Sequence, residues 1–189
     1  MNLQQMSLRK ILVLSFACLS FASLGQNQVR WMSMEEALAR TEVEPRKIFV
    51  DVYTDWCGWC KKMDKNTFTN DKLAKYLNEV YYPVKFDAEY KKDITFDGKV
   101  YKYIKTYRGG YHELATHILN GKLSFPSFVF LDENMALIQA IPGYQDVLSM
   151  DMILHYFGEN YHKSTPWRKY EKEFIHNLNR TKNTFPVKN

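Results

Sequence analysis

Two cysteines separated by two residues, Cys57 and Cys60, are the residues of this chain whose types and spacing most directly suggest chemistry. Such a pair can close a small disulfide and open it again. An apolar run typical of a buried strand, Ile48–Tyr53, precedes the pair, and a helix-compatible segment follows it. A Cys-x-x-Cys pair at the junction of a strand and a helix indicates a redox site.

The two sulfurs are expected to have different roles. A thiol attacks only as its thiolate, and a free cysteine titrates near pH ~8.5. Cys57 is expected in the first turn of its helix, where unpaired N–H groups and the helix dipole favour an anion and lower the thiol pKa. Cys60 is expected on the same side of that helix. The spacing therefore predicts that Cys57 attacks a disulfide and that Cys60 resolves the mixed disulfide.

Other uses of a cysteine pair fit the sequence less well. A zinc site needs about four ligands, but there is no second Cys-x-x-Cys and the five histidines are scattered. Covalent haem attachment requires histidine directly after the second cysteine, where this chain has Lys61. A copper-carrying pair usually belongs to a smaller fold, and an inert disulfide across so short a loop would stabilise little. We expect redox chemistry with no metal and no cofactor.

The N-terminus has the pattern of a secretory signal peptide over residues 1–25. Arg9 and Lys10 precede an apolar stretch, Ile11–Ala22, and small residues come before Gln26. The stretch is shorter than the ~20 residues that span a bilayer. An uncleaved membrane anchor and a lipidated Cys18 are the alternatives. Cleavage would leave Cys57 and Cys60 as the only cysteines, in one domain over residues 26–189.

The surrounding pattern predicts a mixed central sheet with helices on both faces. Ser33 and Glu36 form a capping box at the start of the first helix, and Asn70 is a helix-start residue. The expected helices are 34–40, a segment from about 57 through 63, 70–80, 146–157 and 164–178, and the expected strands are 47–53, 82–87, 128–131 and 136–141.

Residues 88–124 are predicted to be an insert of less regular structure. Asp97-Gly98 is a strong hairpin-turn signal, Gly109-Gly110 is expected to break regular structure, and 112–119 is expected to be a short helix. The tail 179–189 has little apolar periodicity and is expected to fray. The insert could form a partner-specific rim or a decorative hairpin on the sheet. It is rich in tyrosine: Tyr90, Tyr101, Tyr103, Tyr107 and Tyr111.

The run from Val50 to Lys61 resembles the active-site segment of thioredoxin-like proteins, above all exported bacterial ones related to the C-terminal domain of thiol:disulfide interchange proteins. The resemblance covers about residues 31–160 and fails across 88–124. It implies an α/β thioredoxin fold, with the insert before the strand that follows a cis proline and an extra C-terminal helix at about 165–178.

The resemblance also implies roles for individual residues. It makes Asp51 a buried acid beneath the cysteines that assists proton transfer, although an acid bonded to a strand-end amide is the alternative. Burial should raise its pKa. Lys85 either pairs with that acid or is a solvated strand-end lysine. Phe125-Pro126 resembles the family's cis-proline signature, in which the backbone of Phe125 contacts an extended substrate.

Trp56 and Trp59 flank the cysteines and are predicted to form an apolar contact surface around them. The alternative is that Trp56 and Trp59 are partly buried aromatic residues without a role in contacting other molecules. Gly143, shortly after the last strand, also matches the family's pattern.

Taken together, these features predict an exported, periplasmic thiol–disulfide oxidoreductase, with a reductase favoured. Its partners would be protein dithiols and disulfides and an electron donor in the membrane. The net charge of +5 is mild and spread along the chain, so it does not indicate nucleic acid. The alternatives are a binding or chaperone module with a mostly oxidised pair and a disulfide isomerase.

Overall fold

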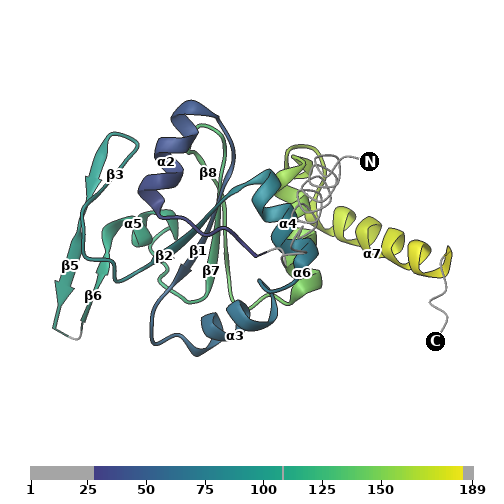
Figure 1. The fold of residues 1–189 in the computed structure, drawn as a ribbon, viewed down its shortest axis with the longest axis horizontal. Coiled ribbons are helices and arrows are strands. Elements are labelled where there is room, and N and C mark those ends of the chain that lie inside the picture. The colour runs from purple at the N-terminus through teal and green to yellow at the C-terminus, as the bar shows by residue number, and fades with distance from the viewer. Residues whose placement is uncertain (1–27, 108, 185–189) are drawn as a thin grey trace, which may run out of the picture.

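A four-stranded mixed sheet forms the centre of the molecule (Figure 1). The structure, a computed structural model, describes residues 28–107 and 109–184, so the predicted signal peptide lies outside the described residues. The strand order is β2-β1-β7-β8; β1 runs parallel to β2 and antiparallel to β7, which is antiparallel to β8. The strands are β1 (Ile48–Tyr53), β2 (Tyr82–Asp87), β7 (Ser127–Leu131) and β8 (Leu137–Pro142).

Helices cover both faces of this sheet, which confirms the predicted architecture. Successive side chains of a strand point to opposite faces, so Val50 packs with α2 and α5, whereas Phe49 packs with α3, α4 and α6. Val50 and Phe49, which point to opposite faces, are both fully buried. A strand that is covered on two faces requires this. The helices are α2 (Met34–Val43), α3 (Gly58–Asn66), α4 (Asp71–Val80), α5 (Glu113–Ile118) and α6 (Val147–Gly158).

The predicted helix starts are confirmed by their caps. The side chains of Ser33, Asn70 and Asp146 each accept a hydrogen bond from the backbone N–H three residues on, which satisfies one of the unpaired donors of a first turn. The first helix runs to Val43, beyond its expected end, because no helix breaker occurs before Pro45.

The insert consists of two small hairpins followed by α5. Asp97 and Gly98 have φ of 48° and 71°, the left-handed conformation that a two-residue hairpin turn requires, so the predicted hairpin is confirmed. The predicted break at Gly109-Gly110 is wrong, because both glycines lie in a strand paired with residues 105–106. The strands are β3 (Ile94–Phe96), β4 (Lys99–Tyr101), β5 (Tyr103–Thr106) and β6 (Gly109–His112).

The two hairpins differ in how they are held. Ile94, Phe96 and Tyr101 of the first hairpin are buried and join the core on the α2 side of the sheet. The second hairpin is more exposed, and the N–H of His112 at its end donates to the carbonyl of Ala88, 2.7 Å away. The first hairpin is therefore part of the core, and the second is a projection anchored at its base.

The C-terminal helix is longer than expected. After a short 3-10 turn, η2 (Tyr161–Lys163), α7 (Trp167–Thr184) begins behind Pro166 and runs through most of the tail predicted to fray. The prediction was wrong for residues 179–184, because this segment has no helix breaker even though it has few apolar residues. Residues 185–189 of the predicted tail lie outside the described residues. The insert and α7 lie at opposite ends of the molecule (Figure 1). None of the helices within residues 28–107 and 109–184 has the length and apolar character needed to cross a membrane.

Candidate active site

The two cysteines lie at the start of α3 and are joined by a disulfide. Their Cα atoms are 5.3 Å apart. Cys57 is the N-cap of the helix, and its Sγ accepts a hydrogen bond from the N–H of Cys60 at 3.1 Å. A donor at the positive end of a helix stabilises a thiolate. In the reduced protein this arrangement would favour the thiolate of Cys57 over that of Cys60.

The surroundings of the pair combine a nearly buried disulfide with exposed aromatic rings. Cys57 is 5% exposed and Cys60 is 2% exposed, so Cys57 is the more accessible sulfur-bearing residue. Trp56 and Trp59 are 67% and 56% exposed. Large exposed apolar rings of this kind are a common feature of surfaces that bind other molecules.

A buried carboxyl group lies on the strand that leads to the cysteines. Asp51 is 1% exposed on β1, and its register partner on β2 is Lys85. The Nζ of Lys85 donates to Asp51 Oδ2 at 2.6 Å and also forms an ion pair with Asp64 of α3. Of the two alternatives for Lys85, the structure shows the pairing with the acid. Because Asp64 follows Cys60 by one helical turn, this network connects the strand to the cysteine helix.

Burial has opposite effects on the two members of this pair. It raises the pKa of Asp51 to about 6, and the charge and hydrogen bond of Lys85 offset only part of that rise. Burial lowers the pKa of Lys85, but the carboxylates of Asp51 and Asp64 outweigh it, so the net change is upward. The other oxygen of Asp51, Oδ1, has no hydrogen-bond partner among the described residues. Asp51 can therefore gain and lose a proton near neutral pH, while Lys85 stays charged.

The predicted proline loop lies beside the cysteine loop. The peptide bond between Phe125 and Pro126 is cis. The rings of Phe125 and Trp56 contact each other edge to face, with centroids 5.8 Å apart. The Pro126 carbonyl accepts a hydrogen bond from the N–H of Gly143 at 2.8 Å, and Gly143 has the positive φ of 95° that glycine adopts readily.

The second hairpin of the insert also reaches this region. A cavity of about 230 Å³ lies between Trp56, Phe125 and the hairpin residues Thr106, Gly110 and Tyr111. The sequence did not single out two further residues of its wall, Thr54 and Glu89, or the Asp64 of the buried network. Asp64 could have been found from its helical spacing to Cys60, but no pattern in the sequence marks Glu89.

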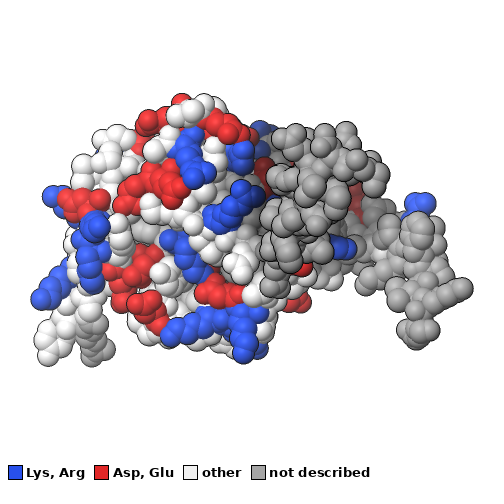
Figure 2. Space-filling view, in the orientation of Figure 1, with Lys and Arg blue, Asp and Glu red and all other residues white. Residues whose placement is uncertain are grey.

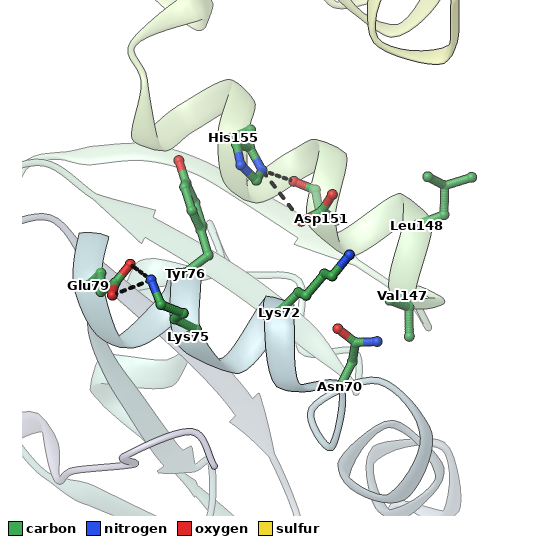
Figure 3. A pocket seen from close by; sticks show the side chains of 9 residues that line it. All are labelled: Asn70, Lys72, Lys75, Tyr76, Glu79, Val147, Leu148, Asp151 and His155. Carbon is green, nitrogen blue, oxygen red and sulfur yellow. Dashed lines mark hydrogen bonds and ion pairs between the residues drawn. The ribbon is translucent and has the colours of Figure 1, made fainter. Parts of the chain in front are cut away.

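A larger hollow between α4 and α6 is not a candidate for this chemistry (Figure 3). Its volume is about 570 Å³, and its lining contains none of the predicted site residues. Lys75 and Glu79 form an ion pair there, and His155 lies 3.5 Å from Asp151. Among the residues that the structure describes, no three His, Cys, Asp or Glu side chains converge in a way that could hold a metal ion.

Parts of this chain are similar in sequence to curated proteins. It is 33% identical to human spermatogenesis-associated protein 20 over 69 residues, which are 36% of this chain and 9% of that protein. An uncharacterized protein of Caenorhabditis elegans is 31% identical over 71 residues, 37% of this chain and 10% of that protein. This chain thus spans only about a tenth of the length of these relatives.

Solved structures share the fold at low sequence identity. A thioredoxin-fold protein from Helicobacter pylori has a TM-score of 0.54 and 17% identity, covering 75% of this chain and 87% of that one. A thioredoxin from Thermus thermophilus has a TM-score of 0.51 and 18% identity, covering 74% and 99%. The structure described as DsbH oxidoreductase has a TM-score of 0.50 and 16% identity, covering 70% and 85%.

A family model covers most of the chain. It is described as Thioredox_DsbH, "Protein of unknown function, DUF255", and it matches residues 21–179. These residues include both cysteines, the buried acid, the insert and most of α7. The chain has the thioredoxin fold and belongs to the Thioredox_DsbH family.

Proposed function

We propose that this protein is a thiol–disulfide oxidoreductase that reduces protein disulfides outside the cytosol. The thiolate of Cys57 attacks one sulfur of a substrate disulfide, forms a mixed disulfide and releases the other substrate sulfur as a thiolate. The thiolate of Cys60 then attacks Cys57 and releases the second substrate sulfur. The substrate gains two electrons and two protons, and the Cys57–Cys60 disulfide forms. A dithiol partner must reduce it again.

One observation carries the proposal: the Cys57 sulfur caps α3 within bonding distance of Cys60 and next to exposed aromatic rings. A disulfide that only stabilised the fold would not need a helix N-terminus or an exposed surface around it. Its short loop also gives it little stabilising effect.

Asp51 is proposed to assist the second step as a proton relay. Cys60 is too buried to exchange its proton easily with water, being 2% exposed. A carboxyl group with a pKa of about 6 is suited to accept a proton near neutral pH. The ion pairs of Lys85 with Asp51 and with Asp64 connect this acid to the helix that carries Cys60.

The direction of electron flow and the compartment belong to the same proposal. The buried acid and the resemblance of residues 50–61 to exported thioredoxin-like proteins favour a reductase supplied with electrons by a membrane protein. The signal pattern in residues 1–25 favours export to the periplasm. Equilibration with glutathione redox buffers tests the direction. A potential near −270 mV, that of thioredoxin, would support a reductase, whereas one near −120 mV would make the protein an oxidant.

Reduction of insulin disulfides by dithiothreitol tests the activity. We expect catalysis by the wild type and none by Cys57→Ser. The Cys60→Ser variant should accumulate a mixed disulfide with the substrate, which a non-reducing gel would reveal. Equal rates with wild type and Cys57→Ser would contradict the proposal.

The exposure of Trp56 and Trp59 favours one other candidate, a binding or chaperone module that holds unfolded chains. Such a module would suppress aggregation of a denatured protein equally well with and without Cys57. A disulfide isomerase, the third candidate, would instead restore activity to a protein with scrambled disulfides.

A further inference from the structure

The cavity between the cysteine loop and the insert has the size of a subsite for one side chain. Its volume of about 230 Å³ is below the roughly 300–1,000 Å³ of pockets for small-molecule ligands. Trp56, next to Cys57, and Phe125, next to the cis proline, form one wall, and Tyr111 of β6 belongs to the insert side. We call this cavity the insert pocket.

Two polar side chains that line the insert pocket indicate that it binds a ligand. Thr54 is 1% exposed, and its hydroxyl has no hydrogen-bond partner among the described residues. A buried hydroxyl without a partner is costly, so a ligand that hydrogen bonds to it would recover free energy. The Oε1 of Glu89 accepts a hydrogen bond from Trp56 Nε1 at 3.3 Å. That contact places a carboxylate beside the exposed indole ring.

The described lining of the insert pocket contains one charged side chain, the acidic Glu89, although the chain as a whole has a net charge of +5. No described residue of its lining is a lysine or arginine. Burial and then the nearby carboxylates of Asp55 and Glu89 raise the pKa of Asp87, against the lowering effect of its hydrogen bond from the Glu89 N–H and the charge of Lys91. The three acids therefore form one cluster. Figure 2 shows acidic side chains gathered between the insert and α3, and basic ones along α3.

We propose that the insert pocket binds a lysine or arginine side chain of an extended substrate segment, close in sequence to the cysteine that Cys57 attacks. The inference rests on the proposed function and names its substrate class: protein disulfides flanked by a basic residue. The occupant is a cationic segment of another protein.

The chemistry of the wall matches this occupant better than it matches the alternatives. The methylene stem of a lysine or arginine packs on the rings of Trp56 and Phe125, and a cation over an indole face is attracted to it. The charged end meets the carboxylate of Glu89 and donates to the Thr54 hydroxyl. An acidic side chain at the same place would be repelled by Glu89. A neutral apolar side chain would leave the hydroxyl unpaired.

Three disulfide peptides that differ only in the residue next to the reacting cysteine test the inference. The residue is lysine, norleucine or glutamate, and the second-order rate constant of the reduced protein is measured by release of a quenched fluorophore. We expect the lysine peptide to react about tenfold faster than the glutamate peptide at low salt, with norleucine between them. The preference should weaken as salt rises.

The Glu89→Gln variant should lose most of the preference for the lysine peptide over the glutamate peptide. The Glu89→Lys variant should react faster with the glutamate peptide instead. Glu42→Gln is the matched control, because it removes the same charge from an exposed position of α2 and should keep the wild-type ratio. Equal rates for the three peptides with wild type would overturn the inference. So would a lysine preference that survives in both Glu89 variants.

These outcomes differ from a failure of the proposed function. If the reduced wild type reacted with none of the three peptides and did not reduce insulin, the proposed reductase activity itself would be wrong, and the inference with it. If all three peptides reacted at one rate, the reductase would stand and only the basic-residue specificity would fall.

Discussion

At the scale of single residues, the most unusual feature is a lysine, Lys85, that is shared by the carboxylates of Asp51 on β1 and Asp64 on the cysteine helix. Asp51 is almost fully buried, whereas Asp64 is about half exposed. Burying a carboxylate costs free energy even when it is paired. A protein that needed only stability would gain by replacing this group. The cost therefore favours a chemical role for Asp51 over a structural one.

The pKa of Asp51 makes a prediction about stability. Its pKa of about 6 in the folded protein exceeds the ordinary 3.8, so the folded state binds the proton more tightly. The full stability is present below pH ~4 and is lost as pH rises through about 6. The Asp51→Asn variant has no titrating group at this position, so it should not lose stability as the pH rises. At pH 8 its free energy of unfolding should exceed that of the wild type by up to roughly 3 kcal/mol.

Urea unfolding of the oxidised proteins at pH 4, 5, 6 and 8 measures this difference. The difference in unfolding free energy between Asp51→Asn and wild type should be small at pH 4, increase up to pH 6 and then level off. Asp93→Asn, at an exposed position of the insert, is the control and should stay within about 0.5 kcal/mol of wild type. A gap independent of pH would show that Asp51 does not titrate in this range.

At the scale of elements, the second hairpin depends on a close approach of backbone and ring. A Cβ on Gly110 would lie 2.2 Å from Tyr103 Oη and 2.5 Å from the carbonyl oxygen of Ile104. The ring of Tyr103 also has Lys91 Nζ over its face at 3.4 Å. The glycine therefore lets β6 lie flat against the Tyr103 ring and hold its side of the insert pocket.

Gly110→Ala should destabilise the protein by about 1–3 kcal/mol, because the backbone oxygen of Ile104 cannot move aside without breaking the hairpin. Gly58→Ala is the matched control, since a Cβ there meets nothing within 4 Å and the position is in the first turn of α3. It should be neutral or slightly stabilising. Thermal unfolding of the oxidised proteins measures both changes, and equal melting temperatures would contradict the prediction.

At the scale of the whole molecule, the extra helix and the insert extend the fold in opposite directions (Figure 1). The start of α7 packs on α6, where Tyr170 is buried and its ring lies 5.0 Å from that of Tyr156. This contact belongs to the core on the α4 and α6 side of the sheet. The cysteine loop, in contrast, borders the insert. We therefore expect α7 to support the fold without shaping the site.

Tyr170→Ala should cost about 3 kcal/mol of unfolding free energy, the usual loss for a buried aromatic ring, while the rate of the Cys57 reaction with a small disulfide stays unchanged at 25 °C. Lys172→Ala, two residues further along α7 at an exposed position, should change neither quantity. Denaturant unfolding and stopped-flow kinetics give the two values. A rate that falls in Tyr170→Ala while the protein remains folded would show that α7 does reach the site.

The fold was predictable where local pattern and local structure agree. Capping residues such as Ser33 and Asn70 and the turn at Asp97-Gly98 act through their own backbone neighbours, so the sequence alone marks them. The same holds for the start of α3 at the cysteines. One error, at Gly109-Gly110, came where a residue's role depends on a distant one. Gly110 is an example, because the ring that requires a glycine there is on another strand.

The sequence by itself determined that two cysteines lie where a strand gives way to a helix, because spacing and helix-start chemistry are local. Only the tertiary structure decided that Lys85 reaches Asp51, since that contact depends on the register of two strands far apart in the chain. It also decided that Glu89 and the second hairpin border the cysteine loop. Such contacts follow from how elements pack, and no spacing along one segment encodes them.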